Sequence, residues 1–202
     1  MILRTVARVI STVFHPLLIP TWGFAMLLWS GIYSASLHSG MRWEIMRTVF
    51  LTTCVFPAAL MRIIELFPES VAKLGTNMER VVPLLATALF YIIGANCIGN
   101  MPVHRVFRIL LSSASFTVII LCLVSFSWKI SVHAGGIGGM LGIVLALALH
   151  SVLNLWAPVS CIILLCGLIG TSRLLLEKHT VAQVFAGYLA GIVPQFIYYM
   201  IF

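Results

Sequence analysis

Residues 171–187, TSRLLLEKHTVAQVFAG, gather several polar side chains in a chain that is otherwise almost wholly apolar. Arg173 precedes His179 by six residues, and Gln183 follows His179 by four. Residues four apart share one face of a helix, so Gln183 can hydrogen-bond the His179 imidazole and determine which ring nitrogen carries the proton. A guanidinium beside an oriented imidazole is suited to bind an anion and to attack it or protonate it. The simpler explanation is a polar turn between two apolar helices.

Two further groups of polar residues have related chemistry. Lys73 and Arg80, in KLGTNMERVVP, lie seven residues apart, about two helical turns, so both cations can point the same way. Ser131 and His133, in KISVHAGGIGG, precede a glycine-rich stretch, and the free N–H groups at a helix start bind anions. Each group also has a structural explanation, either cations that reach lipid headgroups or a serine cap with an interfacial histidine. Together the three groups supply cations, a hydroxyl and two histidines, which are suited to phosphoryl transfer.

The composition indicates where these side chains lie. Of the 202 residues, 61% are hydrophobic and 8% are charged, whereas about 25% are charged in a soluble protein. Such a chain cannot cover a water-exposed surface with polar groups, so we predict an integral membrane protein in a lipid bilayer. The net charge of +7 comes from scattered basic residues, which favours anionic lipid headgroups and membrane boundaries over nucleic acid as the partner. The five cysteines lie in apolar runs without C-x-x-C spacing, as buried apolar residues do.

Apolar segments of about 20 residues predict membrane-spanning α-helices, because a helix satisfies its own backbone groups where water is absent. The candidate spans are 16–35, 45–67, 81–101, 105–127, 134–153, 155–171 and 180–202. The break near Asn154 is weak, so one long bent helix is the alternative there. We therefore expect an all-α fold, a polytopic transmembrane bundle of six or seven spans, forming one domain over residues 1–202. Residues 1–14 are expected to form an amphipathic interfacial helix.

The span count also predicts which loops share a side of the membrane. With seven spans, segments 68–80, 128–133 and 172–179 all lie on the side of the N-terminus, so the three polar groups should meet there. His38 and His104 fall on the opposite side, and His150 falls deep within a span. Glycine pairs with G-x-x-x-G spacing would allow the helix backbones to approach closely: Gly135 and Gly139, Gly138 and Gly142, and Gly187 and Gly191.

The spacings K-x6-R, S-x-H and S-R-x5-H resemble the three-part signature of the type 2 phosphatidic acid phosphatase superfamily. That signature runs K-x6-R-P, P-S-G-H and S-R-x5-H-x3-D. Lys73 and Arg80 match its first part, although Val81 stands where proline is usual. Ser131 and His133 match its second part, with isoleucine and valine in place of the proline and glycine.

The third part of the signature is the most specific match. Ser172, Arg173 and His179 have the family spacing, whereas Gln183 stands where the family has aspartate. The resemblance covers about residues 73–187, and the phosphatase-like core would extend over about residues 73–202.

The resemblance implies roles for the matched residues. The phosphoryl oxygens would be held by Lys73, Arg80, Ser131 and Arg173. His179 would attack phosphorus to form a phosphohistidine, oriented by Gln183, and His133 would protonate the leaving oxygen and then activate water. The reaction would need no metal and no cofactor, and the sequence offers no cluster with metal-ligand spacing.

The resemblance also implies a substrate class and a location. The chain would be a phosphoric monoester or pyrophosphate hydrolase that acts on a lipid phosphate or a polyprenyl (pyro)phosphate. It would lie in a bacterial inner (cytoplasmic) membrane, with the site facing outward. Because Gln183 supplies orientation without charge, a catalytically weak or inactive relative that binds a phosphorylated lipid is the alternative. A structural membrane protein, whose cations contact headgroups, is a third.

Overall fold

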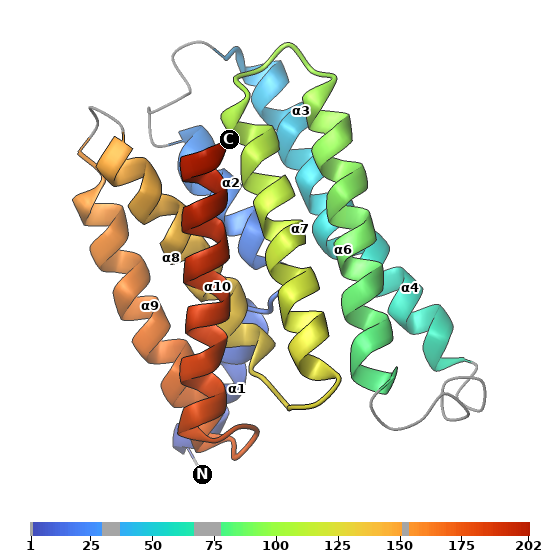
Figure 1. The fold of residues 1–202 in the computed structure, drawn as a ribbon, viewed down its shortest axis with the longest axis vertical. Helices are drawn as coiled ribbons and strands as arrows, with labels where there is room; N and C mark the ends of the chain where they lie inside the picture. The colour runs from blue at the N-terminus through green and yellow to red at the C-terminus, as the bar shows by residue number, and fades with distance from the viewer. Residues whose placement is uncertain (1, 30–36, 67–77, 151–153) are drawn as a thin grey trace.

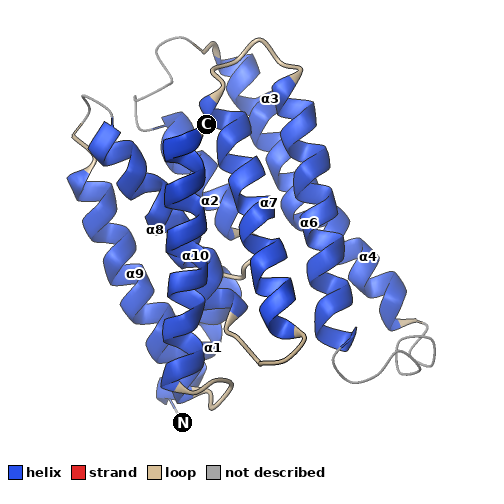
Figure 2. Ribbon diagram, viewed as in Figure 1, coloured by secondary structure: helices blue, strands red, loops and turns tan. Residues whose placement is uncertain are grey.

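The structure is a computed structural model that describes residues 2–29, 37–66, 78–150 and 154–202. Within these ranges all regular secondary structure is helical, and loops connect the helices (Figure 2). The helices are α1 (Ile2–Val13), α2 (Ile19–Trp29), α3 (Ser39–Phe50), the π-helical turn η1 (Leu51–Val55), α4 (Phe56–Glu65), α6 (Met78–Gly99), α7 (Val106–Ser125), α8 (Val132–His150), α9 (Trp156–Leu175) and α10 (Val181–Ile201).

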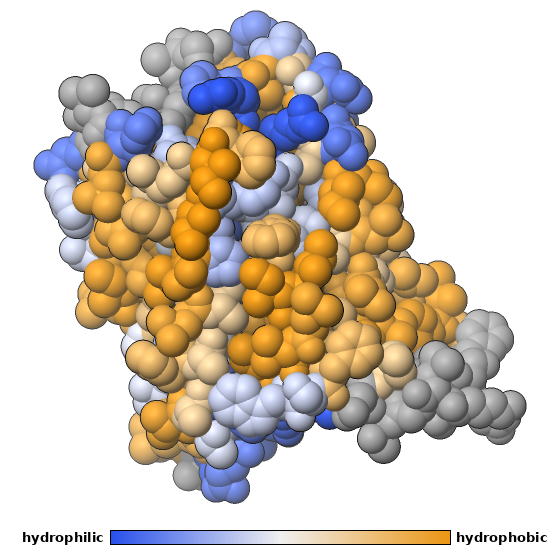
Figure 3. Space-filling view, in the orientation of Figure 1, coloured by the Kyte–Doolittle hydropathy of each residue, from blue (hydrophilic) through white to orange (hydrophobic). Residues whose placement is uncertain are grey.

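Six helices in the described part of the chain are long and apolar enough to cross a membrane, and α3, η1 and α4 together form the first of them. The 11-residue α2 is apolar but shorter. Hydrophobic side chains cover most of the height of the molecule, and hydrophilic ones gather at its two ends (Figure 3). The predicted all-α transmembrane bundle is therefore confirmed, and the chain is an integral membrane protein.

The weak sequence break near Asn154 separates two helices. Helix α8 ends at His150 and α9 begins at Trp156, and the two helices pack side by side (Figure 1). The Asn154 side-chain oxygen accepts the Trp156 N–H at 3.3 Å, which satisfies one of the free donors at the start of α9. The alternative of one long bent helix is therefore wrong.

Helices α8 and α10 pack closely at the centre of the bundle through glycines (Figure 1). A Cβ atom on Gly187 would lie 2.6 Å from the Ser131 carbonyl oxygen, and one on Gly138 would lie 2.8 Å from that of Tyr188. A Cβ on Gly191 would collide with the backbone of Gly135. The predicted glycine-mediated packing is present, and it holds the start of α10 against the start of α8.

One end of the bundle collects the helix termini that flank the predicted polar segments. The start of α1, the end of α4, the starts of α6, α8 and α10 and the ends of α7 and α9 all lie at the lower end in Figure 1. His38 precedes α3 and His104 precedes α7 at the other end. His150 was expected deep within a span, but it is the exposed last residue of α8. That expectation was wrong because His150 stands in the last turn of α8, close to the end of the bundle.

Candidate active site

His179 and Gln183 meet at the start of α10, where the backbone is held by a reciprocal cap. The Gln183 N–H donates to Thr180 Oγ1 at 3.4 Å, and the Thr180 N–H donates to Gln183 Oε1 at 3.1 Å. His179 Nδ1 lies 3.3 Å from the same Gln183 oxygen. A side-chain oxygen that already accepts the Thr180 N–H can only accept again, so His179 Nδ1 must donate. Neutral His179 therefore carries its proton on Nδ1 and leaves Nε2 unprotonated, and the ring also interacts with the Lys129 backbone.

Arg173 lies in the last turn of α9 and is half-buried. Across the described ranges, the buried side-chain atoms without a hydrogen-bond partner are Arg173 Nε and Ser11 Oγ. The positive charge of Arg173 acts on the three imidazoles of His15, His133 and His179. A buried guanidinium N–H without an acceptor is costly unless the site serves to bind one. The position of Arg173 among three histidines therefore suits an anion.

His133 lies in the first turn of α8 and is covered by the N-terminal part of the chain. Its Nε2 lies 3.1 Å from the carbonyl oxygen of Ser11 at the end of α1. A carbonyl only accepts, so His133 Nε2–H is the donor. The ring of His15 meets the ring of His133 edge-on, with their centroids 5.5 Å apart. The segment between α1 and α2 thus adds a third histidine to the site.

The sequence interpretation did not include His15. No spacing rule connects it to His133, because the two residues are more than 100 positions apart and come together only when α1 folds against the bundle. Its position in the dipeptide His15-Pro16, directly after the amphipathic α1, was the available signal. Lys129 was also missed, and both its backbone and its charge act on His179.

Ser131 has a clear structural role. Its hydroxyl accepts the Ala134 N–H at 3.4 Å, which caps α8, and its own N–H donates to the Gln183 carbonyl oxygen at 3.2 Å. The residue is fully buried between α8 and α10. The serine-cap explanation therefore accounts for Ser131, and its contact with a phosphoryl group stays a prediction.

Arg80 lies in the first turn of α6, at the same end of the bundle as Arg173 and His179 (Figure 1). The adjacent Val81 is buried in a small cluster with Cys122, against which Val132 packs. The start of α6 thus approaches the start of α8, and Arg80 is half-buried there. Lys73 lies outside the described residues.

The environment of His179 favours its neutral form. Partial burial lowers the pKa of His179, and the positive charges of Arg173 and Lys129 lower it further, while hydrogen bonds to Gln183 and to the Lys129 backbone partly offset these effects. Burial and Arg173 also lower the pKa of His15. Near pH 7, His179 is therefore a neutral imidazole, which is the form that a nucleophile requires.

No protein-family model matches the chain, and no curated protein or solved structure matches it either. Among the described residues, no group of three or more histidine, cysteine, aspartate or glutamate side chains could hold a metal ion. The chemistry that the site can perform therefore depends on its cations and histidines.

Proposed function

We propose that the protein is a membrane-embedded phosphatase that hydrolyses a lipid phosphate or a polyprenyl (pyro)phosphate through a phosphohistidine on His179. The observation that carries this proposal is the arrangement around Arg173, whose buried Nε–H has no hydrogen-bond partner among the described residues and whose charge acts on His133 and His179. The His179 nucleophile is already in the tautomer that leaves Nε2 unprotonated. An oriented nucleophile beside a cation with an open donor is what phosphoryl transfer requires of a protein.

In the first step, the lone pair of His179 Nε2 attacks phosphorus and forms a P–N bond, while the P–O bond to the leaving group breaks. His133, when protonated, gives its proton to the leaving oxygen. Arg173 stabilises the charge that spreads over the phosphoryl oxygens, and we assign Arg80 and Lys73 to the same task.

In the second step, His133 removes a proton from a water molecule whose oxygen attacks the phosphohistidine. The P–N bond breaks, inorganic phosphate leaves and His179 recovers its lone pair. The negative charge of the bound substrate supports the protonated form of His133 in the first step, because an opposite charge nearby favours the charged imidazole. No metal ion has a part in either step.

A second candidate function is the binding of a phosphorylated lipid without turnover. The observation that favours it is Gln183, whose oxygen is shared between the Thr180 N–H and His179 and carries no charge. In a serine protease triad, replacing the orienting aspartate by its amide lowers turnover about 10⁴-fold.

We assign the protein to a bacterial inner membrane, with the site facing outward, because of the resemblance in its motifs.

Phosphate release by the purified protein in detergent tests the proposal. The substrates are phosphatidic acid, farnesyl phosphate and farnesyl pyrophosphate, each with and without a chelator. We expect release from at least one substrate, unaffected by the chelator and lost in His179→Ala. The control is His104→Ala, at the opposite end of the bundle. Complete loss with chelator, restored by one metal, would contradict the mechanism, and tight lipid binding without release would favour the second candidate.

A further inference from the structure

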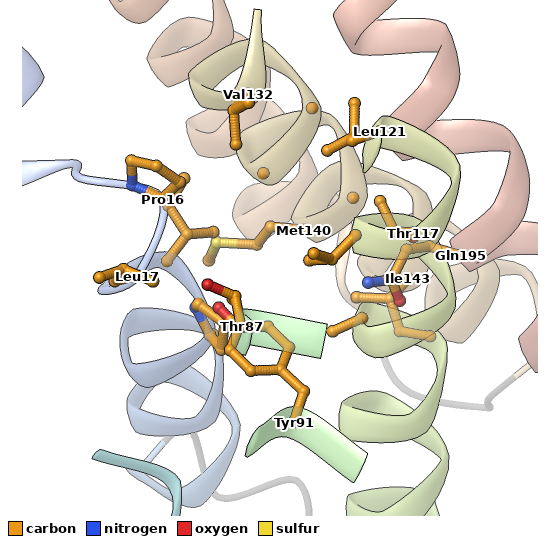
Figure 4. Close-up of a pocket in the computed structure, with 18 of the residues that line it drawn as sticks. Pro16, Leu17, Thr87, Tyr91, Thr117, Leu121, Val132, Met140, Ile143 and Gln195 are labelled. Atoms are coloured by element: carbon orange, nitrogen blue, oxygen red, sulfur yellow. The ribbon is translucent and has the colours of Figure 1, made fainter. Parts of the chain in front are cut away.

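An apolar cavity of about 180 Å³ opens beside the candidate site. Side chains from the segment before α2 and from α6, α7, α8 and α10 converge on it (Figure 4). Val132 and Ile143 both line it, and their separation of eleven positions along the helix corresponds to about 16 Å. The cavity therefore extends through about half of the hydrocarbon thickness of a membrane.

The polar groups that line this cavity are mostly satisfied by the protein. The Thr87 hydroxyl donates to the Pro83 carbonyl at 2.8 Å, and the Thr117 hydroxyl donates to the Ser113 carbonyl at 3.0 Å. At the inner end, Gln195 Oε1 accepts the Ser113 hydroxyl at 2.5 Å. With these groups bonded and the remaining wall mainly aliphatic, the cavity suits a hydrocarbon chain rather than a polar ligand.

His15 lies where this cavity meets the phosphate-binding residues. It lines the cavity, and its ring also touches that of His133. The Leu17 N–H donates to His15 Nδ1 at 3.4 Å, so that neutral His15 carries its proton on Nε2. One residue thus presents a hydrogen-bond donor at the junction between an apolar cavity and an anion site.

We propose that His15 is a specificity-determining residue of the phosphatase proposed above, on which this inference rests. A single hydrocarbon chain of the substrate occupies the cavity, and His15 Nε2–H donates to an oxygen of the leaving group between that chain and phosphorus. In phosphatidic acid this is an oxygen of the glyceryl part, and in farnesyl phosphate it is the bridging oxygen, whose second lone pair stays open to the proton from His133. His133 then protonates the leaving oxygen itself. His15 and the cavity together select substrates whose leaving group carries a hydrocarbon chain over soluble phosphate esters.

His15→Leu removes the donor, and Gly23→Leu fills the cavity. Gly23 lines the cavity, and a Cβ there would approach Met140 Cγ only to 3.9 Å, so the substitution meets ordinary contacts at its first atom. The chain offers a matched control for each. For His15 the control is His104, at the opposite end of the bundle. Its Nδ1 accepts the Val106 N–H at 3.3 Å, as the Nδ1 of His15 accepts the Leu17 N–H. A Cβ on Gly40 has no atom of the described residues within 4 Å.

The measurements are the dissociation constants of fluorescent phosphatidic acid and fluorescent farnesyl phosphate, with kcat/KM for each lipid relative to phenyl phosphate. Because this ratio compares two substrates of one preparation, a reduced folded fraction cancels from it. We expect His15→Leu and Gly23→Leu to weaken lipid binding and to lower the ratio by about tenfold or more. The control variants His104→Leu and Gly40→Leu should match the wild type.

The outcomes separate this inference from the proposed function. Lipid binding and ratios equal to wild type in both His15→Leu and Gly23→Leu would overturn the inference while leaving a phosphatase. If the wild type binds lipid without releasing phosphate, the phosphatase proposal fails, and weaker binding by His15→Leu still supports the His15 contact. If neither lipid binds to the wild type, both are overturned.

Discussion

His179 Nδ1 donates to Gln183 Oε1 at 3.3 Å, and the same oxygen caps α10 by accepting the Thr180 N–H at 3.1 Å. One amide oxygen therefore orients the proposed nucleophile and holds the helix start behind it. This double role explains why a residue of this length stands at the position. An aspartate is one methylene shorter, whereas glutamine and glutamate have the reach that a reciprocal helix cap requires.

The first prediction concerns Gln183→Glu, which keeps the length of the side chain and adds a negative charge beside His179. A carboxylate favours the imidazolium, so the pKa of His179 rises from its lowered value. Since the neutral imidazole is the nucleophile, the rising limb of kcat/KM against pH should move to higher pH. Above that limb, kcat should increase, because the carboxylate stabilises the positive charge that develops on the ring.

Gln183→Leu and Gln183→Asp are the comparisons for this variant. Leucine loses both the cap and the imidazole contact, which should lower the stability by about 1 kcal/mol and reduce kcat sharply. Aspartate adds a negative charge but is too short to reach the Thr180 N–H. The Gln183→Asp variant should therefore lose about as much stability as the Gln183→Leu variant. Equal pH profiles for the wild type and Gln183→Glu would show that residue 183 does not act on His179.

A second prediction concerns Arg173, whose buried Nε makes no hydrogen bond in the part of the chain that the structure describes. Arg173→Ala should weaken phosphatidic acid binding by about tenfold or more, because a charged donor is lost. Arg173→Lys should recover only part of the lost affinity, because an ammonium keeps the positive charge but lacks the planar set of N–H donors of a guanidinium. Isothermal titration in detergent measures the affinities.

Lys178→Ala is the matched control for Arg173. Lys178 is exposed in the loop after α9, five residues beyond Arg173, and its removal should leave the affinity nearly unchanged. Similar losses in the Arg173 and Lys178 variants would indicate a general attraction between positive charge and anionic lipid rather than a site centred on Arg173.

The third prediction concerns the contact between α8 and α10 that holds the two halves of the site together. In Gly191→Ala, the added methyl group would collide with the backbone of Gly135 and Gly139, which should cost about 1–3 kcal/mol. In Gly167→Ala on α9, a Cβ meets no atom within 4 Å in the described part of the chain, and a gain in helix propensity of up to about 1 kcal/mol is expected. Thermal unfolding in detergent should therefore give a lower Tm for the first variant and an unchanged or higher Tm for the second.

The fold was largely predictable because span length, apolar runs and glycine spacing are local properties of the sequence. The helix that begins at Ser39 was placed from residue 45 because Arg42 and Glu44 make its first turns look polar. These charges lie at the end of the bundle, where water and headgroups tolerate them. The sequence therefore predicted the presence of each long helix better than the residues at which that helix begins and ends.

The candidate site was predictable only where one helix connects its parts. The hydrogen bond between His179 and Gln183 follows from a spacing of four residues. The contact of His15 with His133 depends on how α1 folds against α8 and α9, which no local pattern encodes. The burial of Ser131 between α8 and α10 is likewise a tertiary effect, produced by the glycines that bring those helices together.

The most direct test is to trap the phosphoryl group on the protein. The purified protein is mixed with phosphatidic acid or farnesyl pyrophosphate carrying radiolabelled phosphorus, quenched in alkali, in which phosphohistidine is stable, and digested for peptide mapping. We predict acid-labile label on the peptide that contains His179, absent in His179→Ala and retained in His104→Ala. Label that persists in His179→Ala, or phosphate release by that variant at the wild-type rate, would contradict the assignment of His179 as the nucleophile.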